Sequence, residues 1–487
     1  MKSLRLCRLT GLWLLAFALA TSAWADTARL LILHTNDLHD HVRPGYGGHG
    51  GLPYVSGYIK QVRAERKDVL LLDAGDHTEK GDLVAFKSGE TLMYELMRRM
   101  AYDAVTPGNH DEDAGRDGLH RYEKILGQPF LNLNLLRADG TPEYRPSRIV
   151  DVAGVRVGII GLIVPRQELC LNLEESGRAL AKEAERLKRE VHLVIALCHQ
   201  GVRNCAVWSK LAPAVDVFVS GHSHEILVKP AVAPATGVVI VQAGSYAEWV
   251  GRLELEIDLT AKKVVHSDGR LVPMRHDAIP VDAEMLRLVR ERERTLCPEA
   301  AEIVGQNPAE IDAGGVATLA ADALRRAAGR EIGFCHPGQV IRAPLLAGPI
   351  DVNGLFLTGG QRGDATVLTE LSGAEISAYV AALAATSDHD QTVWSGFATA
   401  KDLTPDRRYR VVISELEWTT RFVREVKRAK EHKSGGPLVA REFSVTPSTV
   451  TFISAMTVRV KELTAAKVAL ADEVARLRGG AGLLGAP

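Results

Sequence analysis

The sequence predicts an α/β protein with one large layered domain and a second, smaller mixed α/β domain. Strand-length apolar runs alternate with helical patterns over residues 26–260, as in layered α/β folds. A charged connector follows over residues 261–304, and strands and helices resume over residues 305–455. The chain has 487 residues and a hydrophobic content of 46%, which is enough for two or three domains with a sizeable core.

The individual elements follow from hydrophobic periodicity. In the large domain, strands are predicted at residues 29–36, 68–75, 149–152, 155–163, 192–198, 215–220, 238–245 and 250–257, with helices at 52–66, 89–100 and 174–189. The connector contains a predicted helix at 284–294, and the second domain has predicted helices at 317–328 and 373–385. Helical spacing at residues 456–478 predicts a C-terminal helix, followed by a frayed tail through residue 487.

Residues 1–25 are typical of a cleaved signal peptide rather than of the fold. Three basic residues precede the apolar run at 11–20, and Ala23 and Ala25 offer the small side chains that a signal peptidase requires. The competing interpretation is an uncleaved anchor, but the run is shorter than the ~20 residues that span a bilayer. We therefore expect a periplasmic or secreted protein with no stable membrane span after cleavage.

Charge and cysteine content limit the possible partners and crosslinks. The formal net charge of −1 argues against a nucleic-acid-binding surface, which needs a concentrated excess of Lys and Arg. Export would leave five cysteines in a compartment that permits disulfides. The sequence leaves two alternatives for Cys198 and Cys205. They could form a disulfide bridge, or they could be a pair of buried free thiols.

The stretch that carries most of the chemistry runs from Val105 to Asp113. It passes through a Pro-Gly turn into Asn109, His110 and three carboxylates. Five consecutive polar residues are too many for a segment of the hydrophobic core. Four other strand-like runs also stop at a His or Asp, at Asp37 and His39, at Asp76, at His199, and at His222 and His224. Because ligands bind outside the carboxyl ends of strands in α/β sheets, these five endings are expected to meet in one crevice.

The order of these motifs resembles the calcineurin-like metallophosphatases, and their setting is similar to the 5'-nucleotidase family within them. The resembling set is Asp-x-His, Gly-Asp, Gly-Asn-His-Asp, His and Gly-His-x-His. The resemblance is strong over about residues 28–260 and weaker to about residue 455. It implies a metallophosphatase domain of two packed sheets flanked by helices, followed by a 5'-nucleotidase-like substrate domain.

The resemblance also implies a role for each site residue. One metal ion would be held by Asp37, His39 and His224, and a second by Asn109, His199 and His222, with Asp76 bridging the two. Mixed ligands of this kind suit manganese, zinc or iron better than calcium. Metal-bound hydroxide would attack the phosphoester, while a dyad of His110 and Asp113 would stabilise the transition state or protonate the leaving group.

The second domain departs from the family pattern. The segment that supplies a substrate-binding arginine keeps Ile341 and Arg342 but lacks the Asn and most of the glycines, and the late Gly-Gly-Asp-Gly loop is absent. Arg342 is the candidate phosphate-binding residue. Trp394 and Phe397 are candidate stacking residues.

Three functions are compatible with the sequence. The leading one is an exported 5'-nucleotidase-like enzyme that hydrolyses a nucleotide or a related small-molecule phosphoester. The second is a thiosulfohydrolase-like enzyme of sulfur oxidation with a carrier-protein substrate, because His336-Pro337-Gly338 resembles that branch of the superfamily. The third is a non-catalytic binding protein on a phosphatase fold, against which the complete ligand set argues.

Overall fold

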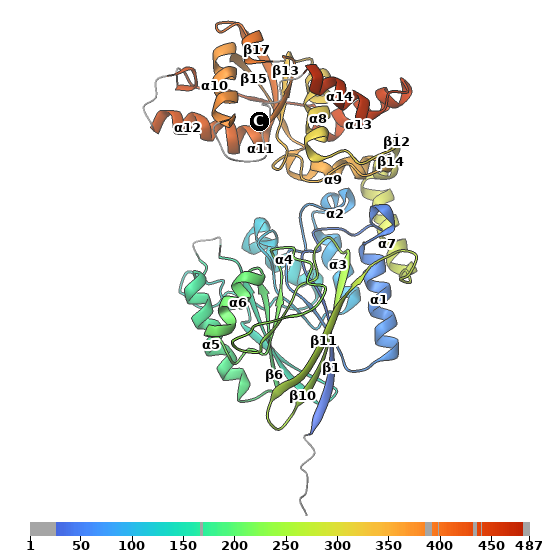
Figure 1. The fold of residues 1–487 in the computed structure, drawn as a ribbon, viewed down its shortest axis with the longest axis vertical. Helices are drawn as coiled ribbons and strands as arrows, with labels where there is room; N and C mark the ends of the chain where they lie inside the picture. The colour runs from blue at the N-terminus through green and yellow to red at the C-terminus, as the bar shows by residue number, and fades with distance from the viewer. Residues whose placement is uncertain are drawn as a thin grey trace, which may run out of the picture.

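The computed structural model describes residues 26–165, 169–384, 392–397, 399–431, 436–439 and 441–480. They form two lobes, seen one above the other in Figure 1. The N-terminal lobe runs from β1 to α7 (residues 27–296) and the C-terminal lobe from β12 to α14 (residues 303–480). The predicted signal peptide, residues 1–25, lies outside the described residues. Within the described ranges, no helix has both the length and the apolarity needed to cross a membrane.

The N-terminal lobe contains two β-sheets. The first has the strand order β11-β10-β1-β2-β3, in which β1, β2 and β3 are parallel, and the second has the order β4-β5-β6-β7-β9-β8, in which β5, β6, β7 and β9 are parallel. The first sheet's strands are β1 (Thr27–Thr35), β2 (Val69–Asp73), β3 (Ala104–Val105), β10 (Trp249–Asp258) and β11 (Lys263–Pro273). The second sheet's strands are β4 (Ser147–Val152), β5 (Val155–Ile163), β6 (Leu193–His199), β7 (Val217–Ser220), β8 (Ala231–Val232) and β9 (Val239–Val241).

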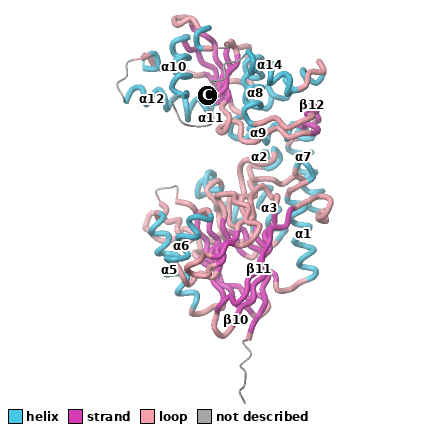
Figure 2. Tube along the Cα trace, viewed as in Figure 1, coloured by secondary structure: helices cyan, strands magenta, loops and turns pink. Residues whose placement is uncertain are grey.

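The two sheets pack face to face and helices cover their outer faces (Figure 2). On β1, Leu30 and Ile32 join the apolar cluster between the sheets, while Leu31 and Leu33 join the cluster under the helices. Strands buried on both faces are expected to be continuously apolar, as residues 30–33 of β1 are. The helices are α1 (Leu52–Glu65), α2 (Leu83–Lys87), α3 (Thr91–Met100), α4 (Gly115–Leu126), α5 (Leu173–Lys188), α6 (Val202–Leu211) and α7 (Ala283–Leu296). The predicted layered fold is confirmed.

The C-terminal lobe is also mixed α and β. Its main sheet has the order β16-β13-β17-β15-β18, and β12 and β14 form a two-stranded sheet. The strands are β12 (Ile303–Asn307), β13 (Ile332–Cys335), β14 (Gly348–Asp351), β15 (Thr366–Ser372), β16 (Val393–Ser395), β17 (Arg408–Ser414) and β18 (Thr446–Pro447). The helices are α8 (Ala313–Ala327), α9 (Val352–Gly363), α10 (Gly373–Ala384), α11 (Glu415–Glu417), α12 (Val423–Glu431), α13 (Phe452–Ala465) and α14 (Leu470–Gly480).

The structure differs from the expected connector at residue 261. Residues 263–273 form β11, which pairs antiparallel with β10 and extends the first sheet beyond the expected end of the large domain at 260. Most side chains of β11 are exposed or half-buried because it is the edge strand. A polar edge strand lacks the apolar run that marks the buried strands, so it resembles a charged connector in sequence.

The C-terminal helix also differs from the expectation. The single helix expected at 456–478 is two helices, α13 and α14, separated by a turn in which Lys467 has a left-handed backbone (φ 55°). Phe452, Met456 and Val460 of α13 are fully buried against the lobe, so this segment belongs to the core rather than to an appended tail. Residues 481–487 of the expected frayed end lie outside the described residues.

Charged and polar contacts join the two lobes. Arg43 lies 2.7 Å from Glu293 of α7 and 3.1 Å from Asp351 at the start of α9, which also accepts a hydrogen bond from the Tyr46 hydroxyl. Asn353 of α9 donates to Asp82 Oδ1 at 2.8 Å and accepts from the Leu83 backbone N–H at 2.8 Å. The lobes therefore meet next to the loop that follows β2.

All five described cysteines are free. Cys198 and Cys205 are both fully buried, and burial raises the pKa of the Cys198 thiol well above its usual value. Of the two possibilities left open by the sequence, the structure has the pair of buried thiols.

Candidate metal centre and catalytic site

Five strand ends deliver the predicted metal ligands to one edge of the N-terminal lobe. β1, β2 and β3 of the first sheet and β6 and β7 of the second all end there. The seven predicted ligands follow or close these strands, and the structure brings them to this edge: Asp37, His39, Asp76, Asn109, His199, His222 and His224. Asn109 is 1% exposed and directly precedes His110.

Asp37, His39 and His224 form the first group of potential ligands, with one atom from each lying within 4.8 Å of the others. His224 Nε2 lies 3.2 Å from Asp37 Oδ1 and 3.1 Å from His39 Nε2. The other nitrogen of His39, Nδ1, lies 3.1 Å from the Thr78 carbonyl oxygen. A backbone carbonyl can only accept, so Nδ1 donates and the Nε2 lone pair faces the group, as a metal-binding imidazole requires.

Asp76, His199 and His222 form the second group, and again one atom from each lies within 4.8 Å of the others. His199 Nδ1 lies 2.7 Å from the Ala74 carbonyl and donates to it. His199 Nε2 is fully buried and makes no hydrogen bond within the described residues. It lies 3.2 Å from Asp76 Oδ2, and the same oxygen lies 3.7 Å from His39 Nε2 of the first group. Asp76 Oδ2 is therefore placed between the two groups.

These residues fit divalent ions on two counts. The Nε2 atom of His199 is buried with no hydrogen-bond partner among the described residues, and buried polar atoms are normally satisfied. Burial alone would lower the pKa of His199, but Asp76 and Asp37 outweigh it and raise the pKa to about 9. For the Asp76 carboxyl group, burial has the opposite effect and would raise the pKa. His199 and His39 outweigh it and hold the pKa of Asp76 well below its usual value. The buried carboxylates thus create a field that favours positive charge.

The backbone is strained at five of the seven predicted ligands. Asp37, His39, Asp76, His222 and His224 all have left-handed φ values, between 46° and 77°. Each such residue costs of order 1–3 kcal/mol and persists only where its surroundings hold it, a situation that concentrates at functional sites.

Asp111 holds the strained loops in place. Its buried carboxylate accepts hydrogen bonds from the backbone N–H groups of Asp76, Thr78 and Gly108, at 3.1, 3.1 and 2.7 Å. The Tyr94 hydroxyl donates to it at 2.9 Å. A β-carbon at Gly108 would lie only 2.1 Å from Asp76 Oδ1, so glycine is required where the two loops touch. Asp111 therefore fixes the position of Asp76 relative to the loop that carries His110.

His110 lies beside the first group, with its ring centroid 5.2 Å from that of His39. Its backbone N–H donates to Asp76 Oδ1 at 2.8 Å. Its Nδ1 lies 3.6 Å from Asp113 Oδ2, but Glu79 Oε2 is in closer contact with the same nitrogen. Lys80 Nζ lies 3.0 Å from His110 Nε2. The pairing of His110 with Asp113 stays a prediction, and Glu79, which is 5% exposed, is the nearer carboxylate.

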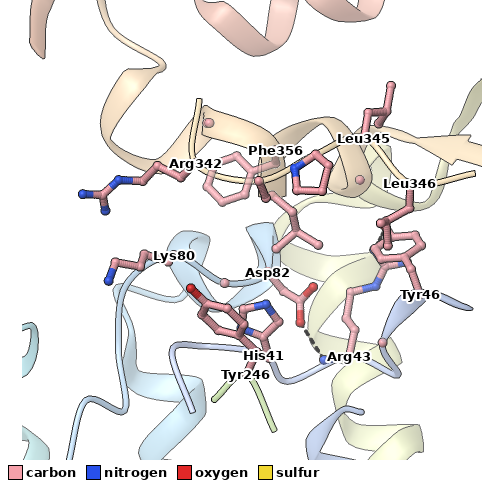
Figure 3. Close-up of a pocket in the computed structure, with 18 of the residues that line it drawn as sticks. His41, Arg43, Tyr46, Lys80, Asp82, Tyr246, Arg342, Leu345, Leu346 and Phe356 are labelled. Atoms are coloured by element: carbon pink, nitrogen blue, oxygen red, sulfur yellow. Dashed lines mark hydrogen bonds between the residues drawn. The ribbon is translucent and has the colours of Figure 1, made fainter. Parts of the chain in front are cut away.

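Arg342 and Lys80 line a cavity of about 370 Å³ between the lobes (Figure 3). Arg342 Nη1 lies 3.2 Å from Glu79 Oε1, so the arginine from the C-terminal lobe reaches the group that contacts His110. Tyr246 and Phe356 lie on opposite walls, and the Tyr246 ring centroid is 5.6 Å from that of His39. Other lining residues are His41, Tyr46, Lys80, Leu345, Leu346 and Gln361.

The expected stacking residues lie elsewhere. Trp394 and Phe397 are 3% and 8% exposed and stack on each other in the core of the C-terminal lobe, with centroids 5.3 Å apart. Their proposed role in the site is therefore wrong, because both rings are covered by the lobe's own core. His336, from the segment resembling the thiosulfohydrolase branch, is also fully buried and does not line the cavity.

The sequence did not identify four residues at the site: Glu79, Lys80, Tyr246 and Gln361. A clue was present for the first two, because an acidic and a basic residue lie three and four positions after Asp76. Tyr246 and Gln361 reach the site through long-range packing, which no local pattern reveals.

Comparison with known proteins places this site in a family. A model of the calcineurin-like phosphoesterase family matches residues 30–225. An endonuclease of Bacillus subtilis is 26% identical over 376 residues, 67% of this chain and 30% of its own length. The mouse 5'-nucleotidase is 28% identical over 306 residues, 54% of this chain and 51% of its own. The match covers 30% of the endonuclease and 51% of the mouse 5'-nucleotidase.

Solved structures extend the similarity of fold to both lobes. A 5'-nucleotidase precursor from Thermus thermophilus superposes with a TM-score of 0.68 at 23% identity, covering 90% of this chain and 97% of its own. A sulfate thiohydrolase from the same organism gives a TM-score of 0.65 at 15% identity, with coverages of 89% and 94%. Members of the matched family use divalent metal ions, and this chain has the residue groups to hold them. Residues 30–225 therefore match the calcineurin-like phosphoesterase family, and the chain is similar to 5'-nucleotidases in sequence over about half of its length and in fold over both lobes.

Proposed function

We propose that this protein is an exported, dinuclear metal-dependent phosphohydrolase of the 5'-nucleotidase type that cleaves nucleotides or related phosphate monoesters. The observation that carries the proposal is the position of Asp76 Oδ2, within 3.2 Å of His199 and 3.7 Å of His39. One carboxylate oxygen between two ligand groups is the arrangement expected for a pair of ions sharing a bridging ligand. Manganese, zinc and iron suit this mixed set of oxygen and nitrogen donors.

The residues of the chain have distinct tasks in this proposal. The first ion would be held by Asp37, His39 and His224, and the second by Asn109, His199 and His222, with Asp76 shared. The ions would supply an activated water and neutralise charge on the phosphoryl group. His110 would stabilise the transition state or protonate the leaving oxygen. Arg342, which lines the cavity, would bind phosphate.

Removal of the metal ions tests this proposal. Hydrolysis of an aryl phosphate should disappear after treatment with a chelator and return when manganese or zinc is added, because the residues themselves offer no strong nucleophile. Metal content and turnover are measured on the same samples, and circular dichroism serves as the control for folding. Full activity in metal-free protein would rule out the metal-dependent mechanism. Rapid cleavage of a thiosulfonate without phosphatase activity would favour the sulfur-oxidation alternative.

Specificity for the nucleobase should be weak. The polar side chains at the far end of the cavity already bind one another: Tyr46 and Arg43 bind Asp351, and Asp82 binds Asn353. A site discriminates strongly only where substrate polar groups meet pocket groups that are otherwise unpaired.

We therefore expect kcat/KM values for adenosine, guanosine and uridine monophosphates within about tenfold of one another, ~1.4 kcal/mol in transition-state binding. Steady-state kinetics on the three nucleotides measure this spread. A strong preference for one base would show that the cavity offers base-specific hydrogen bonds.

A further inference from the structure

The loop after Asp76 places two oppositely charged residues around His110. Glu79 contacts Nδ1 of the imidazole, and Lys80 Nζ lies 3.0 Å from Nε2. Both residues also line the cavity between the lobes. Lys80 therefore extends to the side of His110 that is opposite its carboxylate partner, at the point where the cavity meets the metal centre.

Contacts from both lobes hold the loop in this shape. Glu79 and Lys80 have left-handed φ values of 70° and 73°, which residues with a β-carbon rarely adopt. The Glu79 N–H donates to Asp40 Oδ2 at 2.8 Å, and the Lys80 N–H donates to Gln361 Oε1 of α9. Gln361 Nε2 is itself held by Glu90 at 3.2 Å. An unfavourable backbone held by the buried Asp40 on one side and the half-buried Gln361 on the other indicates that the direction of Lys80 matters to the site.

The charges of Glu79, Lys80 and Arg342, at one end of the cavity, favour a doubly charged group. Arg342 reaches the same end of the cavity from the opposite lobe, and Figure 3 shows its guanidinium and the Lys80 ammonium extending in the same direction. Glu79 lies 3.2 Å from Arg342 and offsets one of the two cations. The three side chains together carry one net positive charge. A phosphate monoester has one more negative charge at neutral pH than a diester, so it gains more from this surplus.

We propose that Lys80 is a specificity-determining residue that binds a non-bridging oxygen of the reacting phosphoryl group and makes the site select monoesters over diesters. Gln361 acts as its positioning residue from the C-terminal lobe. This inference rests on the proposed phosphohydrolase function. It adds the side chain that sets the preference for the monoester.

The test compares a monoester and a diester with the same leaving group, 4-nitrophenyl phosphate and bis(4-nitrophenyl) phosphate, on the metal-loaded protein. Lys80→Met should lower kcat/KM for the monoester by about 10–100-fold, the loss expected for one charge-assisted hydrogen bond. The value for the diester should change by less than about threefold, since the lost interaction depends on the second charge. If the diester is not cleaved, its inhibition constant replaces kcat/KM.

Three further variants sharpen the comparison. Lys80→Arg keeps the charge and should retain most of the preference for the monoester. Gln361→Ala should weaken the preference without removing any charge. Lys87→Met removes an equivalent charge from the exposed end of α2 and should leave both substrates unaffected. Equal losses for monoester and diester in Lys80→Met would overturn the proposal, because Lys80 would then act through the orientation of His110.

Binding of inorganic phosphate separates this inference from the proposed function. Calorimetry on manganese-loaded protein should show phosphate binding weakened by at least about tenfold in Lys80→Met. A wild-type protein that binds phosphate through Lys80 but hydrolyses no ester would contradict the proposed function alone. Unchanged phosphate affinity in the variant would contradict the role of Lys80 alone.

Discussion

Replacing Asp76 by alanine should empty the metal centre and reduce hydrolysis to background. Its Oδ2 lies between His199 and His39, and its Oδ1 accepts the His110 backbone N–H at 2.8 Å. Substituting a residue that only orients a ligand typically costs 10–100-fold in metal affinity, and loss of a shared ligand should cost more. Metal content by mass spectrometry and turnover of an aryl phosphate should fall together.

A matched control separates this effect from general loss of charge. Asp117→Ala removes an exposed carboxylate from α4 and should leave both metal content and turnover unchanged. Asp76→Asn keeps the size of the side chain and an oxygen that can accept from His110, so it shows whether the negative charge is what retains the ions. An Asp76→Ala protein that keeps its full metal content would disprove the shared-ligand assignment.

Replacing His110 by alanine should lower turnover by roughly 10²–10⁴-fold, the usual range for a lost general acid or base, while the metal content stays intact. The imidazole of His110 lies in a separate cluster with Glu79 and Asp113, and in neither of the two ligand groups that contain Asp76 and Asp37. Turnover and metal content are therefore expected to separate in this variant, in contrast to Asp76→Ala. If His110→Ala lost its ions in proportion to its activity, His110 would be a metal ligand.

The carboxylate partner of His110 can be identified in the same experiment. Glu79 contacts Nδ1 more closely than Asp113, which lies 3.6 Å away with its side chain 51% exposed. A buried carboxylate interacts with an imidazole more strongly than an exposed one because water screens it less. Glu79→Gln should therefore lower turnover more than Asp113→Asn. The reverse order would restore the dyad expected from the sequence.

Much of the large domain could be predicted because its strands are buried on both faces. Residues 30–33 of β1 and 193–198 of β6 are all apolar, so the change from Leu33 or Cys198 to polar residues marks the ligand-binding end. Five such changes in one chain predict convergence, since parallel strands present their carboxyl ends at the same edge. The structure brings these five ends together.

The remaining features depend on contacts that the sequence does not encode locally. The edge strand β11 has no apolar run because one of its sides faces solvent. The closer partner of His110 is Glu79 rather than Asp113, since a left-handed backbone turns residues 79 and 80 toward the imidazole. Trp394 and Phe397 stack on each other inside the C-terminal lobe, and a pair of nearby aromatic residues gives no indication of which surface it will cover.

The loop at residues 76–83 is part of the N-terminal lobe but is also attached to the C-terminal lobe by hydrogen bonds. At one end it carries Asp76, and at the other Lys80, Asp82 and Leu83 are hydrogen-bonded to Gln361 and Asn353 of α9. A rotation that moved α9 away to widen the cavity would have to break these bonds or pull the loop with it. Release of inorganic phosphate would then be coupled to the same movement that withdraws Lys80 from His110, so that opening of the cavity and loosening of the product are one event.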